Sequence, residues 1–110
     1  MGADSFIVVA TGDNAQQAFD KAVKNAQHEN GHGGYTGTIA EKRSFRIIHL
    51  GPAPEGKKTM AWATDEANRL LEECDPRIDD KWGDAGCFAL GVGENKMGIP
   101  TYVFFGYASS

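Results

Sequence analysis

Residues 27–37 concentrate the residue types that carry out chemistry. They include His28, Glu29 and His32 in an H-E-x-x-H string, with four of the fourteen glycines. On a continuous helix this spacing places two imidazoles on one face, where they bind Zn²⁺ while the glutamate acts as a general base. The Asn-Gly pair at 30–31 predicts instead that a helix ends there, because glycine readily adopts the left-handed conformation of helix ends. We therefore expect a solvated helix end, with zinc bound by His28 and His32 as the alternative.

A second motif, G-x-x-x-x-G-K, runs from Gly51 to Lys57. It lies between an expected strand and an expected helix, which is the context of a phosphate-binding loop. Lys58 stands where such a loop needs a serine or threonine to bind magnesium, so we do not expect nucleotide hydrolysis. Lys57, Lys58 and Thr59 at a helix N-terminus would still suit an anion, because unpaired N–H groups and positive charge attract it. The alternative is an exposed basic loop.

The glycine-rich segment is itself a candidate ligand-binding loop. Gly33 and Gly34 allow backbone N–H groups to approach a ligand closely, while Tyr35 can stack on it and Thr36 can hydrogen-bond. Glycines also occur in turns for purely geometric reasons, and that interpretation stays open. With Lys57, Lys58 and Thr59, these residues form the predicted site for an anionic, nucleotide-like molecule.

Residues 31–42, with the sequence GHGGYTGTIAEK, resemble a stretch of small uncharacterised proteins of bacteriophages and mobile elements. The resemblance covers this segment alone and transfers no catalytic residue. It implies a small accessory protein that blunts a host defence, either by sequestering a ligand or by occupying a host protein.

Composition sets the broad class of the protein. The 110 residues carry a net charge of −4 with 41% hydrophobic residues, which predicts one globular domain spanning residues 1–110. The acidic balance argues against direct nucleic-acid binding, which favours basic surfaces. No apolar run approaches the length of a membrane span, and the N-terminal residues do not resemble a secretory signal. We expect a cytoplasmic protein in which Cys74 and Cys87 are reduced thiols in the core.

The elements that must position these residues follow from hydrophobic periodicity. Residues 6–10 predict a buried strand, and Asp13 with Gln16 predicts the capped start of a helix that continues to about Asn30. The apolar stripe of this helix predicts that Phe19 and Val23 pack it against the sheet. Residues 35–40 and 44–50 predict a β-hairpin. A second helix is expected from about Thr59. Its apolar face comprises Ala63, Ala67, Leu70, Leu71 and Cys74.

Residues 87–92 and 101–107 predict two further apolar strands, so the element order is β-α-β-β-α-β-β. We therefore expect an α+β fold: a ferredoxin-like β-α-β-β-α-β sandwich with an extra C-terminal strand, in which two helices cover one face of an antiparallel sheet. The open face or edge of such a sheet suits a partner or a homodimer.

These expectations combine into a functional hypothesis. The chain is expected to be a non-enzymatic binding protein of phage or mobile-element type, a host-defence inhibitor whose partner is a host protein or an anionic small molecule, with no cofactor. The alternative function is a small zinc-dependent hydrolase built on His28, Glu29 and His32.

Overall fold

The computed structural model describes residues 3–30, 38–51, 53–80, 83–91 and 99–109, which contain four strands, two α-helices and one short 3-10 helix. The strands are β1 (Ala3–Thr11), β2 (Phe45–Ile47), β3 (Ala85–Gly91) and β4 (Thr101–Ser109). The helices are α1 (Ala15–Asn30), α2 (Thr59–Glu72) and the short 3-10 helix η1 (Ile39–Glu41). The predicted α+β class is confirmed.

The four strands form one mixed sheet in the order β1-β4-β3-β2. Strand β4 runs antiparallel to both β1 and β3, whereas β2 runs parallel to β3. The predicted ferredoxin-like order and the wholly antiparallel sheet were therefore wrong. The physical reason is the long connection through α2, which carries the chain back so that β2 and β3 start at the same end of the sheet.

The predicted hairpin of residues 35–40 and 44–50 is also wrong in the part that the structure describes. Instead of a strand, residues 39–41 form η1, because the Thr38 hydroxyl accepts a hydrogen bond from the Ala40 N–H at 3.2 Å and caps a helical turn. Only Phe45–Ile47 joins the sheet in this region, so the described residues contain four strands rather than five.

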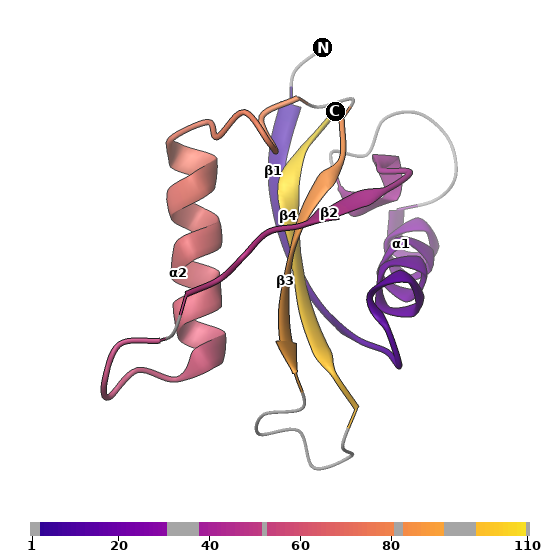
Figure 1. Ribbon diagram of the computed structural model, residues 1–110. Helices are drawn as coiled ribbons and strands as arrows, with labels where there is room; N and C mark the ends of the chain where they lie inside the picture. The colour runs from indigo at the N-terminus through magenta and orange to yellow at the C-terminus, as the bar shows by residue number, and fades with distance from the viewer. Residues whose placement is uncertain (1–2, 31–37, 52, 81–82, 92–98, 110) are drawn as a thin grey trace.

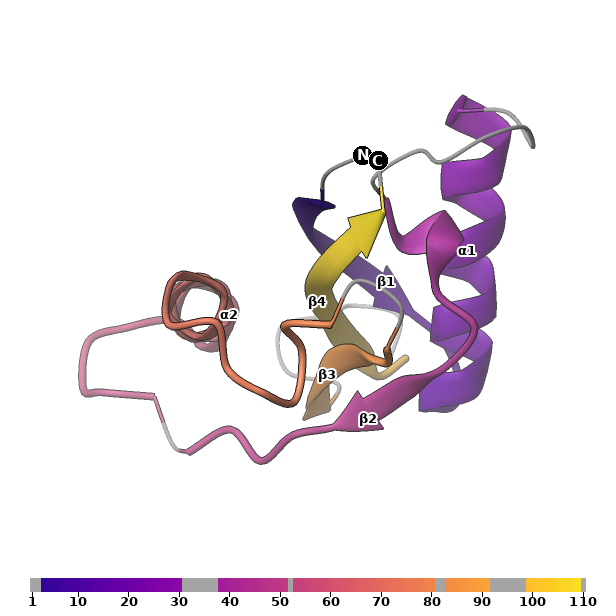
Figure 2. The ribbon, with the colours of Figure 1, turned by 90° about the horizontal axis from the view of Figure 1, so that it is seen from above.

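The two helices cover opposite faces of the sheet, not one face as predicted. Figures 1 and 2 show α1 and α2 on either side of the strands. Alternation along β4 explains this, because successive side chains of a strand point to opposite faces. Tyr102, Phe104 and Ala108 pack in the α1 cluster, whereas Val103 and Phe105 pack in the α2 cluster.

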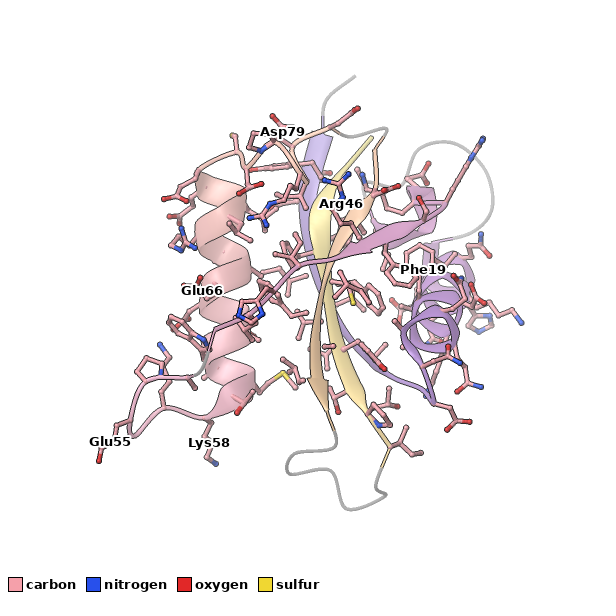
Figure 3. The ribbon with its side chains drawn as sticks, viewed as in Figure 1. Phe19, Arg46, Glu55, Lys58, Glu66 and Asp79 are labelled. Carbon is pink, nitrogen blue, oxygen red and sulfur yellow. The ribbon has the colours of Figure 1, made fainter. Side chains whose placement is uncertain are left out.

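Helix α1 begins one residue later than its predicted capping box. The Asn14 side chain, rather than that of Asp13, accepts the hydrogen bond from the Gln17 N–H at 2.8 Å, and the Gln17 side chain reaches back to the Asp13 N–H. Phe19, 3% exposed, lies against Phe45 and Phe104 with ring centroids 5.1 and 5.5 Å away. The prediction that Phe19 packs α1 against the sheet is confirmed (Figure 3).

Helix α2 begins at Thr59 as predicted, and its apolar stripe buries Ala63, Ala67, Leu70 and Leu71. Cys74 was wrongly placed on that stripe. It is exposed and lies beyond the helix with φ 52°, where the N–H groups of Cys74 and Asp75 bond to the Leu71 and Leu70 carbonyls. This is a Schellman helix end with cysteine in the position that usually holds glycine.

Candidate functional site

Strand β1 is an outer edge of the sheet (Figure 2). All nine of its residues pair with β4 without a bulge, from Ala3 opposite Ser109 to Thr11 opposite Thr101. Within the described chain, the backbone groups on its other side have no partner. A regular edge of this kind offers a row of N–H and C=O groups to any chain that can extend the sheet.

The side chains of β1 leave this edge unprotected. Its sequence, ADSFIVVAT, contains no proline, lysine or arginine, which are the residues that usually block pairing at an edge. Asp4 is its single charged residue, and it lies near one end of the strand. Val9 has 50% of its surface exposed, and Ile7 and Val8 are half-buried. The edge therefore presents apolar surface from the middle of β1 toward its C-terminal end.

Strand β2, at the opposite edge, is different. It has three residues, and Arg46 at its centre is exposed (Figure 3). Short length and positive charge are both features that discourage an added strand. The contrast makes β1, not β2, the candidate interaction surface, and it makes Arg46 a matched control for experiments on β1.

A positive charge lies at the far end of β1. The Lys21 ammonium, from α1, donates to the Thr11 hydroxyl oxygen at 3.3 Å. Asp4 lies at the beginning of the same strand, so the edge has an acid at one end and a base at the other. A strand that pairs with β1 would therefore be favoured by a base opposite Asp4 and an acid near Lys21.

The structure describes three of the seven residues of the predicted anion site, Lys57, Lys58 and Thr59. Lys57 forms an ion pair with Asp65, and its ammonium also lies 6.0 Å from the centroid of the Trp62 ring. The Trp62 indole N–H donates to the Gly51 carbonyl at 3.0 Å, so these residues fasten the preceding loop to α2. Lys57 therefore has an acidic partner already, which weakens it as an anion ligand.

Lys58 and Thr59 do lie at the start of α2, as expected (Figure 3). Lys58 is the N-cap, its side chain makes no capping hydrogen bond, and both residues are exposed. The other four predicted ligand-binding residues, Gly33, Gly34, Tyr35 and Thr36, lie outside the described residues. Their part in binding an anionic ligand stays a prediction.

The structure describes one of the two histidines of the zinc alternative. His28 is exposed in the last turn of α1, which remains helical through Asn30, while His32 lies outside the described residues. Within the described ranges, no three His, Cys, Asp or Glu side chains gather closely enough to hold a metal ion. The zinc site therefore also stays a prediction.

Sequence reasoning missed the buried amine of Lys42, which is only 4% exposed. It donates to the carbonyls of Asp80 and Gly83 at 3.2 and 2.9 Å, joining η1 to the segment before β3. Burial lowers the pKa of the Lys42 ammonium, although the charges of Asp80 and Asp84 oppose that shift. Nearby, the Ser44 hydroxyl donates to the Asp84 carboxylate. Because Lys42 bonds to main-chain carbonyls that keep loop and strand together, these contacts fit a structural anchor.

No sequence signal pointed to Lys42, since it lies in an ordinary Glu-Lys-Arg run. Of the two thiols, Cys87 is buried, as predicted, and burial raises its pKa to about 12. Cys74 is exposed, which contradicts its predicted place in the core. The Cys87 thiol is therefore protonated at neutral pH and is a poor nucleophile.

None of the helices among the described residues has the length and apolar character needed to cross a membrane. Comparison with protein-family models, curated proteins and solved structures finds no match to the chain.

Proposed function

We propose that the chain is a small non-enzymatic binding protein that captures an extended segment of a host protein through the edge of β1. In this mode the partner segment becomes a fifth strand of the sheet, with main-chain hydrogen bonds supplying affinity and alternate side chains supplying specificity. The observation that carries the proposal is the unprotected nine-residue edge of β1.

The energetics suit such a partner. Each main-chain hydrogen bond contributes about 0.5–1.5 kcal/mol net, so several are needed along the strand. Burial of the exposed Val9 surface would add a hydrophobic contribution. The segment resembling phage and mobile-element proteins is the reason for proposing a host protein as the target, with inhibition of a host defence as the outcome.

The test compares proteins retained from a bacterial lysate by the full chain, Val9→Lys and Arg46→Glu. The lysine adds charge to the β1 edge and removes its exposed apolar surface, whereas the glutamate alters the β2 edge. A partner that is retained by the wild type and Arg46→Glu but not by Val9→Lys supports the proposal. The purified partner is then titrated against the three proteins, and the same order of affinities is required. Equal retention by all three proteins, or loss with Arg46→Glu alone, contradicts it.

An anionic small molecule is the second candidate ligand, supported by the uncapped start of α2 at Lys58 and Thr59. A thermal-shift panel of mono-, di- and cyclic nucleotides tests it, with Lys58→Ala as the variant and Lys24→Ala, exposed on α1, as the control. A rise in melting temperature that Lys58→Ala abolishes favours this ligand. No rise for the wild type with any nucleotide rejects it.

A further inference from the structure

The edge of β1 is complementary to itself. We infer that β1 pairs antiparallel with β1 of a second copy of this chain, about a two-fold axis that passes beside Val8. This inference deepens the proposed function, because the same edge then serves two occupants. The four-stranded sheets of the two copies would become one continuous sheet, with the α1 helices on one face and the α2 helices on the other.

The register follows from the alternation of side chains. Opposed residues in an antiparallel pair point to the same face of the sheet, and side chains alternate between faces along a strand. In a symmetric pair of identical strands the numbers of opposed residues therefore differ by an even number. The two-fold axis must then pass between one residue and its own counterpart. With the axis at Val8, Val9 of each copy faces Ile7 of the other, and the exposed Val9 surface is covered by an apolar neighbour. With the axis one residue earlier, Val9 would face Ser5. With the axis one residue later, Val9 would face Val9 but Ile7 would face Thr11. Only the axis at Val8 gives both Ile7 and Val9 an apolar neighbour, so the apolar surface of β1 favours it.

Charge supports the same register. With the axis at Val8, Asp4 of one copy lies opposite Gly12 of the other, beside the Thr11 hydroxyl that accepts from Lys21. Asp4 then approaches Lys21 of the other copy, and symmetry makes this contact twice. Asp13 is an acid at the same end of the strand. No two charged residues of β1 itself face each other, since Asp4 is its single charged residue.

Self-pairing has a consequence for partner capture. A second copy bound at β1 hides the backbone groups that a host segment needs, so the host segment must displace it. Capture then depends on the total concentration of the chain, and the monomer is the form that binds.

The first experiment measures the monomer–dimer equilibrium of the full chain by sedimentation over a concentration series. The wild type should shift from monomer to dimer as concentration rises. Asp4→Lys and Lys21→Asp should each raise the dissociation constant by about tenfold, since each substitution alters both symmetric contacts. The double variant Asp4→Lys/Lys21→Asp should restore the wild-type value, while Arg46→Glu leaves it unchanged. Circular dichroism checks that each variant is folded.

The second experiment fixes the register by cross-linking. In a Cys74→Ala background, Val8→Cys should form an intermolecular disulfide under mild oxidation, because residue 8 of each copy faces its counterpart. Ser5→Cys should not, because it faces Thr11 of the other copy. A wild type that remains monomeric at all concentrations, a double variant that fails to restore the dimer, or equal cross-linking of both cysteine variants overturns the inference. A monomeric wild type leaves the proposed capture of a host segment intact, and that capture fails separately if Val9→Lys binds the host partner normally.

Discussion

The Tyr107 hydroxyl donates a hydrogen bond of 2.5 Å to the main-chain carbonyl of Leu71, joining β4 to the last turn of α2. The two residues are 36 positions apart, so the contact fastens the C-terminal end of α2 to the sheet through a carbonyl that also accepts from the Cys74 N–H.

Tyr107→Phe tests this contact. Removing the hydroxyl leaves the Leu71 carbonyl without that donor and should lower the free energy of unfolding by about 1–2 kcal/mol. Tyr102→Phe is the matched control, because its hydroxyl makes no hydrogen bond to the described residues. Urea denaturation measures both variants. Equal losses would show that the Tyr107 hydroxyl contributes nothing specific.

Cys74→Gly should stabilise the protein by about 0.5–1 kcal/mol, because glycine adopts the left-handed conformation without the steric cost of a side chain. The gain is reduced by the greater freedom of glycine in the unfolded chain. Cys74→Ala is the control, since it removes the thiol and keeps the steric cost. A lower melting temperature for the glycine variant than for the alanine variant would contradict the strain argument.

Gly86→Ala should be strongly destabilising. A Cβ at this position would lie 2.6 Å from Cζ of Phe105 and 2.9 Å from Cγ2 of Ile78, both in the buried core. Overpacking of this kind costs about 1–3 kcal/mol. Gly51→Ala is the control, because a Cβ there meets no atom within 4 Å. Thermal denaturation measures the midpoint of each variant. Similar midpoints for Gly86→Ala and Gly51→Ala would count against the close packing of β3.

Lys42 should give stability a distinctive pH dependence. Its pKa in the folded protein is below the ordinary 10.5, so the unfolded chain binds more protons between the two values. The free energy of unfolding therefore gains a contribution that grows as pH rises through that window. Lys42→Met removes this contribution and should cost about 1–3 kcal/mol at neutral pH, since two carbonyls lose their donor.

The measurement for Lys42 is urea denaturation from pH 7 to 10.5. Arg43→Met, at the exposed neighbouring position, is the control and should retain the wild-type slope. A Lys42→Met profile parallel to the wild type would show that the buried amine does not titrate differently in the folded protein.

Phe19→Ala should lower the free energy of unfolding by about 3–5 kcal/mol, as expected for a large aromatic side chain removed from a core. Its contacts with Phe45 and Phe104 join α1 to both β2 and β4. Lys24→Ala, on the exposed side of α1, is the control and should change little. An unaltered midpoint for Phe19→Ala would contradict the packing of Phe19 between α1 and the sheet.

The sequence predicted the helices well and the sheet poorly, for a physical reason. The apolar stripes of α1 and α2 are local and periodic, so Phe19 and Leu70 could be assigned to the core from spacing alone. Strand order and direction arise from long-range pairing, so nothing near Phe45 revealed that β2 would run parallel to β3. The edge position of Val9 depends on that order, and was equally hidden. Lys42 was missed because lysine is rarely buried.

The pairing of Ala3 with Ser109 has a mechanical consequence. The beginning of β1 and the end of β4 lie at the same end of the sheet. A force that pulls these two strand ends apart therefore acts first on the β1–β4 hydrogen bonds nearest to Ala3 and Ser109. The force then acts on one residue pair at a time, so the β1–β4 hydrogen bonds break in sequence. They would resist together only if the strands were sheared along their length, across all nine pairs. A protease or translocase that pulls on the beginning of β1 would therefore separate β1 from β4 first, and would disrupt the binding edge before it separated β4 from β3.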